Sequence, residues 1–183
     1  MLLKSLTRYK SLNDTYINVA RLRKPSFFVI HHDVNINIDK LLKITRYEHN
    51  HGWKSNLFLR ANPDTMNQKI GRRILKMGHD IGFLYDSLSL ASRVYAEMPQ
   101  RDVYRHAWLH FQNVLKENIT LNMTAISCFN HDDGVDNLCL WKDFDYRTAG
   151  IRCNTDAEFT HDVVYIYIRT DGISFREIGR AHV

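Results

Sequence analysis

The feature that most constrains this chain is a repeated alternation of short apolar runs with segments of helical periodicity. Ser26 to His32 form a continuous apolar run that ends in polar residues, which is typical of a strand buried on both faces. Residues at helical spacing follow this run, namely Ile38, Leu41, Leu42 and Thr45. Gly52 is the expected end of that helix. The first unit is therefore a strand followed by a helix.

The same unit recurs in the next part of the chain. Lys54 to Arg60 contain a second apolar run, after which Asn62 is expected to cap a helix with Pro63 at its first position. One face of this helix carries Met66, Ile70, Ile74 and Met77. The helix should end at Gly78, and His79 to Tyr85 have the pattern of a third strand.

Two further helices and two further strands complete the pattern. Ser87 or Ser89 can cap the next helix, which we expect to run to about Met98. Another helical face carries Tyr104, Ala107, Phe111, Val114 and Leu115. Met123 to Phe129 and Val163 to Ile168 supply the later strands. Repeated strand-helix units predict an α/β fold with a parallel sheet, either open or rolled into a barrel.

Length and composition favour one soluble domain. A chain of 183 residues, 44% of them hydrophobic, can bury one sizeable core. No apolar run is long enough to cross a bilayer, and Lys4 and Arg8 interrupt the opening segment before a signal-peptide core could form. We expect a cytoplasmic protein. The three cysteines are odd in number and lack CxxC spacing, which argues against a disulfide framework and a structural zinc site.

The charge distribution gives little support to a polyanion partner. The formal net charge is +5, but the 25 Lys and Arg residues are spread among 20 Asp and Glu residues and form no basic stripe. A basic nucleic-acid-binding domain therefore stays a weaker alternative, which would require these cations to gather on one face.

Polar residues follow three of the predicted strands at the point where each strand ends. They occur in the segments His31 to Asn35, Gly78 to Tyr85 and Cys128 to His131. In a parallel barrel, the strand ends at the carboxyl face hold the chemistry, so polar residues there carry more weight than polar residues elsewhere.

In order and spacing, these three segments resemble the NodB-type polysaccharide deacetylases, in the branch with an Arg-His-Asp-Val-Asp first-strand motif. Leu140 to Arg147 and Thr170 to Gly172 agree with two later stretches of that family, so the resemblance spans roughly residues 26 to 172. It implies a distorted parallel (β/α) barrel of the glycoside hydrolase/deacetylase type, with its C-terminal part missing. It also implies carbohydrate metabolism and hydrolysis of an N-acyl group on a sugar by a zinc-like divalent metal.

The resemblance also implies roles for particular residues. Asp33 matches the first-strand aspartate and is expected to act as a base or metal ligand. His32 and Asp171 are the other candidate catalytic residues. The candidate residues for binding a sugar or glycan substrate are His31, Asn35, Asn130 and His131.

Several positions depart from the family pattern. Asn35 replaces a second aspartate and loses its negative charge. Leu84 and Leu88 stand at the positions of metal-binding histidines, and leucine cannot bind a metal. Asn130 stands where this branch has a histidine, for which a one-residue shift would let His131 substitute. Asp86 could replace a lost ligand, although a helix-capping role is favoured.

The final seven residues have a separate explanation. Glu177 to Val183 are what a common sequencing-adapter DNA would encode, so we expect this heptapeptide to be an artefact. The expected domain is residues 1–176, an incomplete polysaccharide deacetylase-like domain.

Two readings of the same ancestry follow. One is a working amide hydrolase with an altered metal site built from Asp33 and some of His32, Asp86 and His131. The other is a non-catalytic relative that keeps the sugar-binding cleft and has lost the metal. The substitutions at the metal positions favour the second reading.

Overall fold

The computed structural model describes residues 10–11, 13–22, 29–34, 38–63 and 65–158. The described chain forms a five-stranded, fully parallel sheet. Its strands pair in chain order and are β1 (Ile30–Val34), β2 (Ser55–Arg60), β3 (Asp80–Tyr85), β4 (Ala125–Cys128) and β5 (Cys153–Asn154). The α/β class and the parallel sheet are thus confirmed. The strand expected at 163–168 and the terminal heptapeptide lie outside the described residues.

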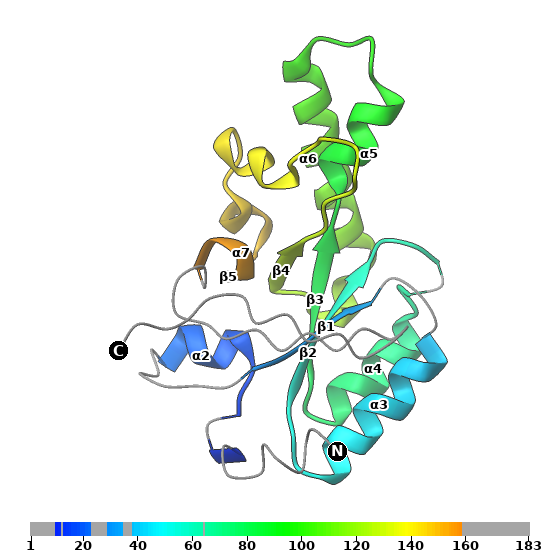
Figure 1. The fold of residues 1–183 in the computed structure, drawn as a ribbon, viewed down its shortest axis with the longest axis vertical. Coiled ribbons are helices and arrows are strands. Elements are labelled where there is room, and N and C mark those ends of the chain that lie inside the picture. Colours follow the sequence, from blue (N-terminus) through cyan, green and yellow to red (C-terminus); the bar gives the residue numbers. More distant parts are fainter. Residues whose placement is uncertain (1–9, 12, 23–28, 35–37, 64, 159–183) are drawn as a thin grey trace.

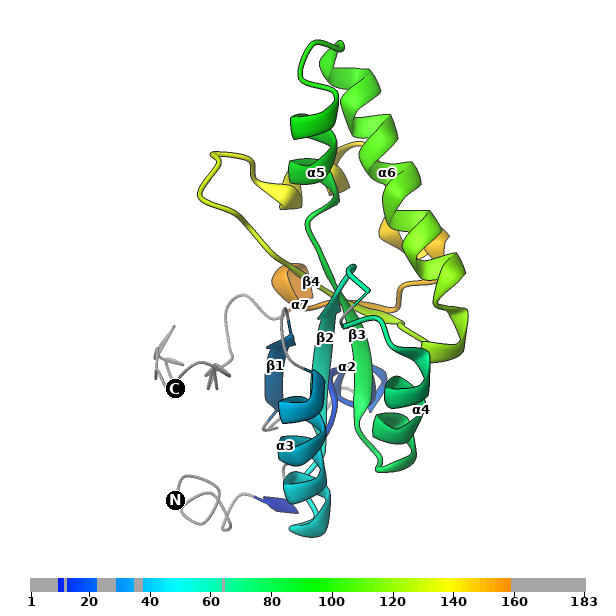
Figure 2. The ribbon, with the colours of Figure 1, turned by 90° about the vertical axis from the view of Figure 1, so that its right-hand side faces the viewer.

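Helices connect the strands, as the alternation in the sequence predicts (Figure 1). The connecting helices are α3 (Ile38–Asn50), α4 (Gln68–Lys76), α5 (Ser87–Val94) and α6 (Gln100–Glu117), which lie between β1 and β4 in the chain. Helix α2 (Tyr16–Leu22) precedes β1, and α7 (Thr155–Glu158) follows β5. Short 3-10 segments are η2 (Ile119–Leu121), η3 (Asn137–Lys142) and η4 (Tyr146–Ala149). Helices α5 and α6 lie side by side beyond the end of the sheet (Figure 2). In the described parts, no helix is long and apolar enough to cross a membrane.

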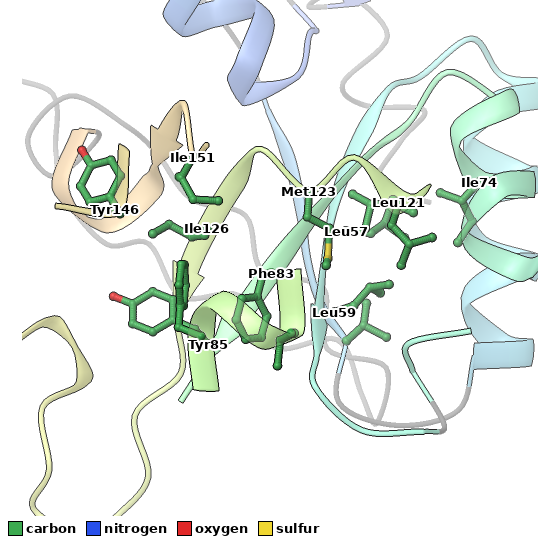
Figure 3. Close-up of a cluster of buried hydrophobic side chains, with 14 of the residues drawn as sticks. Leu57, Leu59, Ile74, Phe83, Tyr85, Leu121, Met123, Ile126, Tyr146 and Ile151 are labelled. Atoms are coloured by element: carbon green, nitrogen blue, oxygen red, sulfur yellow. The ribbon is translucent and has the colours of Figure 1, made fainter. Parts of the chain in front are cut away.

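The main core lies between one face of the sheet and helices α3, α4 and α6, and we call this face the helix-covered face. Strand side chains alternate between faces, and on this side Leu57, Phe83 and Ile126 share one buried cluster with Ile74 of α4 (Figure 3). Phe111 of α6 belongs to the same cluster. These side chains are buried, and each large apolar side chain removed from water stabilises the fold by about 1.5–3 kcal/mol. The helical faces predicted from spacing are therefore the faces that build the core.

The opposite side of the sheet carries a smaller cluster around helix α2, and we call it the α2 face. Tyr16 and Val19 of α2 pack there with Phe58, Leu84 and other buried residues. Because side chains two residues apart share a face, Arg60 lies on the same side as Phe58, next to Leu84 in the strand register. The α2 face is thus apolar along its middle and charged at the carboxyl end of β2.

The sequence predicts the C-terminal ends of α3 and α4 well, whereas it misplaces the N-terminal end of α4. Gly52 and Gly78 follow α3 and α4 with φ of +70° and +85°, backbone conformations that glycine adopts at low cost. The N-cap of α4 is Asn67, whose side chain accepts hydrogen bonds from the backbone N–H groups of residues 69 and 70. Asn62, the predicted cap, instead accepts from Thr65 N in the preceding turn. The predicted cap Asn62 and first helical position Pro63 are thus corrected to Asn67 and Gln68.

Candidate functional site

The candidate site lies at the carboxyl ends of β1 to β4, where polar side chains from neighbouring strands converge on the α2 face. Parallel strands end at the same edge of a sheet, so residues that are distant in sequence come together there. Two groups form this site. The dyad consists of His31 and Asp33, and the arginine cluster consists of Arg60, Asp86 and His131.

The dyad is an imidazole held between a carboxylate and a phenol. His31 Nε2 lies 2.7 Å from Asp33 Oδ1, and His31 Nδ1 lies 3.2 Å from the Tyr16 hydroxyl. The ring stacks on Phe58 with a centroid distance of 4.4 Å. His31 is 4% exposed and Asp33 is 36% exposed. The carboxylate therefore faces solvent, and the buried imidazole orients it through their hydrogen bond. A neutral ring with its proton on Nε2 satisfies both contacts.

Asp156, the second residue of α7, places another carboxylate beside the dyad. Its Oδ2 accepts a 2.6 Å hydrogen bond from the backbone N–H of Cys128. Burial raises the pKa of Asp156, and the negative charge of Asp33 raises it further, against the lowering effects of Cys128 N–H and His31. Sequence reasoning missed this residue because β5, which precedes it, is only two residues long and gives no periodic signal.

The arginine cluster joins three strand ends. Asp86 Oδ2 lies 2.6 Å from Arg60 Nη2, 3.0 Å from Arg60 Nε and 3.0 Å from His131 Nε2. Arg60 Nη2 also lies 3.0 Å from His131 Nε2, and the guanidinium covers the Phe129 ring at 4.7 Å. The cluster includes the predicted residue His131. Arg60 was not predicted, although its position at the end of the second apolar run is a signal that could have found it.

Asp86 is available for this cluster because another residue caps helix α5. Asn137 Oδ1 accepts hydrogen bonds from the backbone N–H groups of Leu88 and Ser89, at 2.9 and 3.1 Å. Asp86 precedes the helix but makes no capping hydrogen bond with its side chain. The predicted caps Ser87, Ser89 and Asp86 are thus corrected to Asn137, which reaches α5 from a distant part of the sequence.

His32 lies on the other face of the sheet from Asp33, so the structure does not bring these two predicted catalytic residues together. Its Nε2 lies 2.8 Å from Glu48 Oε1 under helix α3, and both side chains are 1% exposed. Ser55 Oγ donates to Glu48 Oε2 at 2.9 Å and lies 2.7 Å from His79 Nδ1. Adjacent strand residues point in opposite directions, so only one histidine of the pair can face the site. His32 belongs to a buried polar network that joins α3 to the sheet.

The other predicted site residues have mixed outcomes. Asn130 Oδ1 accepts a 3.0 Å hydrogen bond from the backbone N–H of Asn137, so Asn130 holds the loop that carries the cap of α5. Asn35 and Asp171 lie outside the described residues.

The divalent metal implied by the family resemblance does not fit the side chains at this edge. Leu84 is fully buried on the α2 face, and Leu88 of α5 is buried in a cluster with residues of α6 and η3. Within the described ranges, no group of three or more His, Cys, Asp or Glu residues could hold a metal ion. Asp33, the predicted ligand, contacts His31, whereas Asp86 and His131 contact Arg60.

A comparison of the chain with protein-family models finds no match, and neither does a comparison with curated proteins.

Proposed function

We propose that this chain is a polysaccharide deacetylase-like protein that binds a sugar at the carboxyl edge of its sheet without the metal-dependent hydrolysis of the family. The observation that carries the proposal is the contrast between Asp33 and Leu84. A solvent-facing carboxylate with a fixed histidine partner remains at one strand end, whereas an apolar, fully buried side chain stands at the metal position.

The strand order supports the barrel part of the proposal. The described strands follow one another in chain order from β1 to β5, with no reversal of direction along the sheet. An open doubly wound sheet reverses its strand order at the crevice where ligands bind, whereas a barrel adds each strand beside the last one. We therefore propose that the sheet is part of a distorted (β/α) barrel whose interior is the α2 face.

The chemistry of the edge supports a neutral, hydroxyl-rich ligand. The Asp33 carboxylate can accept hydrogen bonds from sugar hydroxyls, and His31 holds it in one orientation. In the neighbouring arginine cluster, the negative charge of Asp86 offsets the positive charge of Arg60. Because Arg60 is paired and the Asp33 carboxylate is negative, this edge suits a polar ligand better than a polyanion.

Amide hydrolysis is the second candidate function, and the dyad is the observation that favours it. A carboxylate 2.7 Å from an imidazole is an arrangement used in general acid-base catalysis. The altered metal site of this alternative needs His32, Asp86 or His131 to join Asp33. His32 faces helix α3, and the other two contact Arg60, so the geometry favours binding over hydrolysis.

The test is to add an N-acetylglucosamine oligomer to the full chain and to measure binding by calorimetry and acetate release by enzymatic assay. We expect binding without acetate release, with a loss of about tenfold or more in affinity for Asp33→Asn, which corresponds to about 1.4 kcal/mol. Asp143→Asn, which removes an exposed charge immediately after η3, is the matched control and should bind as the parent does.

Each other result has a defined meaning. Acetate release that Asp33→Asn abolishes would establish the hydrolase alternative. No binding by a chain shown to be folded by circular dichroism would refute the proposal for this class of sugar.

A further inference from the structure

Tyr16 reaches the dyad from a helix that is not part of the sheet. It is the first residue of α2 and is buried, and its hydroxyl lies 3.2 Å from His31 Nδ1. The other ring nitrogen, His31 Nε2, lies 2.7 Å from Asp33 Oδ1. The imidazole therefore has one partner on each nitrogen, a phenol from α2 and a carboxylate from its own strand.

The direction of the two hydrogen bonds follows from the chemistry of the partners. An ionised carboxylate only accepts hydrogen bonds, so the contact with Asp33 requires a proton on His31 Nε2. In a neutral ring Nδ1 then carries a lone pair, to which the Tyr16 hydroxyl donates. The hydrogen bond made by one imidazole nitrogen sets which nitrogen carries the proton. Tyr16 thus favours the tautomer that donates to Asp33.

Ring packing alone does not fix the orientation of the imidazole. The His31 ring stacks on Phe58 with a centroid distance of 4.4 Å, and the Tyr16 ring meets both of them edge-on. These contacts limit tilting of the imidazole. Stacking is nearly the same for the two flipped orientations of the ring, whereas the two hydrogen bonds form in only one of them. The Tyr16 hydroxyl therefore contributes an orientation that packing does not.

The segment that carries Tyr16 is bonded to the strand next to the dyad. Asn13 Oδ1 accepts a 2.7 Å hydrogen bond from Lys54 N, and Asn13 Nδ2 donates to Lys54 O at 3.0 Å. Tyr16 N donates to Asn56 Oδ1 at 3.0 Å, and Asn56 is the neighbour of His31 in the strand register. The chain before β1 is thus fixed to the start of β2, and this places the phenol beside the imidazole.

We propose that Tyr16 is a positioning residue of the sugar site, whose hydroxyl holds His31 in the one tautomer and orientation that direct its proton to Asp33. Tyr16 is 1% exposed, so it acts through His31 and does not touch the ligand. Residues that bind a ligand need supporting side chains to keep them in one geometry, and Tyr16 supplies this support to the dyad. The role in sugar binding rests on the proposed function, whereas the effect on His31 does not.

The first measurement is imidazole ¹⁵N NMR of the full chain at pH 8 without sugar, with His31→Gln to assign the signals. The parent should carry its proton on Nε2. Tyr16→Phe, which removes only the hydroxyl, should move the shift of Nδ1 toward that of a nitrogen that accepts no hydrogen bond, and should speed the exchange of the Nε2 proton with water. Tyr47→Phe, at an exposed tyrosine beside the His51 ring, is the matched control and should leave both His31 signals unchanged.

The second measurement is calorimetry with the N-acetylglucosamine oligomer. Tyr16→Phe should weaken binding roughly two- to tenfold, the range that corresponds to one neutral hydrogen bond, and Tyr47→Phe should bind as the parent does.

Three results would overturn the proposal. They are a proton on Nδ1 in the parent, unchanged His31 signals in a folded Tyr16→Phe variant, and unchanged affinity of that variant for a sugar that the parent binds. The parent spectrum tests the proposal even if the variant does not fold. A parent that binds no sugar refutes the proposed function alone, and the NMR signals then decide whether Tyr16 positions His31.

Discussion

The adjacent histidines of β1 sit in two contrasting regions. On the helix-covered face, His32 lies in a buried network in which Glu48, Ser55 and His79 contact one another and the backbone of α3. On the α2 face, His31 supports a carboxylate that reaches solvent. The difference teaches that a cluster of titratable residues is not by itself a site. Solvent access at a strand end distinguishes the α2 face, whereas the network under α3 serves stability.

The strongest test of this contrast removes the carboxylate of the buried network. Glu48→Ala should lower the free energy of unfolding by about 3 kcal/mol or more, because two buried hydrogen-bond partners lose their acceptor. Urea unfolding followed by circular dichroism measures this change. Glu97→Ala, at an exposed position, is the control and should change stability by no more than about 0.5 kcal/mol. Equal effects of the two substitutions would show that the network contributes little.

A smaller effect is expected from adding a methyl group at Gly82, beside Phe58 on the α2 face. A Cβ atom at Gly82 would lie 2.4 Å from the Phe58 ring and 2.9 Å from the Ala125 carbonyl oxygen. Gly82→Ala should therefore destabilise the fold by about 1–3 kcal/mol through overpacking. Adding Phe58→Leu should make the alanine less costly, measured as a favourable coupling in a double-mutant cycle. Simple additivity of the two substitutions would argue against direct contact.

The network on the helix-covered face should weaken in acid. Burial lowers the pKa of His79 below 6.5, so between its folded pKa and 6.5 the unfolded chain binds more protons than the folded one. The stability contributed by neutral His79 is present above pH 6.5 and is lost as the pH falls below it. Thermal unfolding at pH 7.5 and 5.5 measures this loss, which should be smaller in His79→Gln. An unchanged pH dependence in that variant would contradict the assignment to His79.

The α2 face should respond to pH with the opposite sign. Burial raises the pKa of Asp156 above 3.8, so the folded chain holds its proton more tightly than the unfolded one. The stability that protonated Asp156 contributes is present below pH 3.8 and is lost as the pH rises through the raised value. Asp156→Asn should therefore be more stable than the parent at pH 7. A less stable variant would show that the charged carboxylate is needed there.

The smallest stability effect is expected at the dyad itself. Asp33 is 36% exposed, so the energy of its hydrogen bond with His31 is weakened by competition with solvent. Asp33→Asn should change the free energy of unfolding by about 0–1 kcal/mol, measured by urea unfolding. A loss as large as that of Glu48→Ala would place Asp33 among the structural residues and would weaken its candidacy as a site residue.

Strands β1 to β4 follow from local sequence, because their apolar runs are short and bounded by polar residues, whereas the two-residue β5 gives no such signal. The second predicted run, Lys54 to Arg60, differs from β2 by one residue. Side chains alternate between the two faces of a strand, so His31 and His32 point to opposite faces. The prediction that both histidines belong to the site did not take this alternation into account. The alternation would have grouped His31 with Asp33, the pair that the structure brings together.

Other parts of the site depend on contacts between distant segments and could not be predicted from local patterns. The choice of Asn137 over Asp86 as the cap of α5 is decided by the path of the chain after β4. Asp156 reaches the dyad region only because β5 pairs with β4. The barrel type and the sugar ligand stay predictions, since they depend on more than the parallel order of the strands.

The cap of α5 has a consequence for the order in which the protein folds. The first turn of the helix obtains its acceptor from Asn137, which lies 49 positions after Leu88 and 48 after Ser89. A loop of that length must close before the bonds form, and its closure entropy opposes early formation. During synthesis the start of α5 therefore lacks its cap until α6, β4 and the following loop have emerged. The helix completes its first turn late, as part of the assembly of the sheet edge.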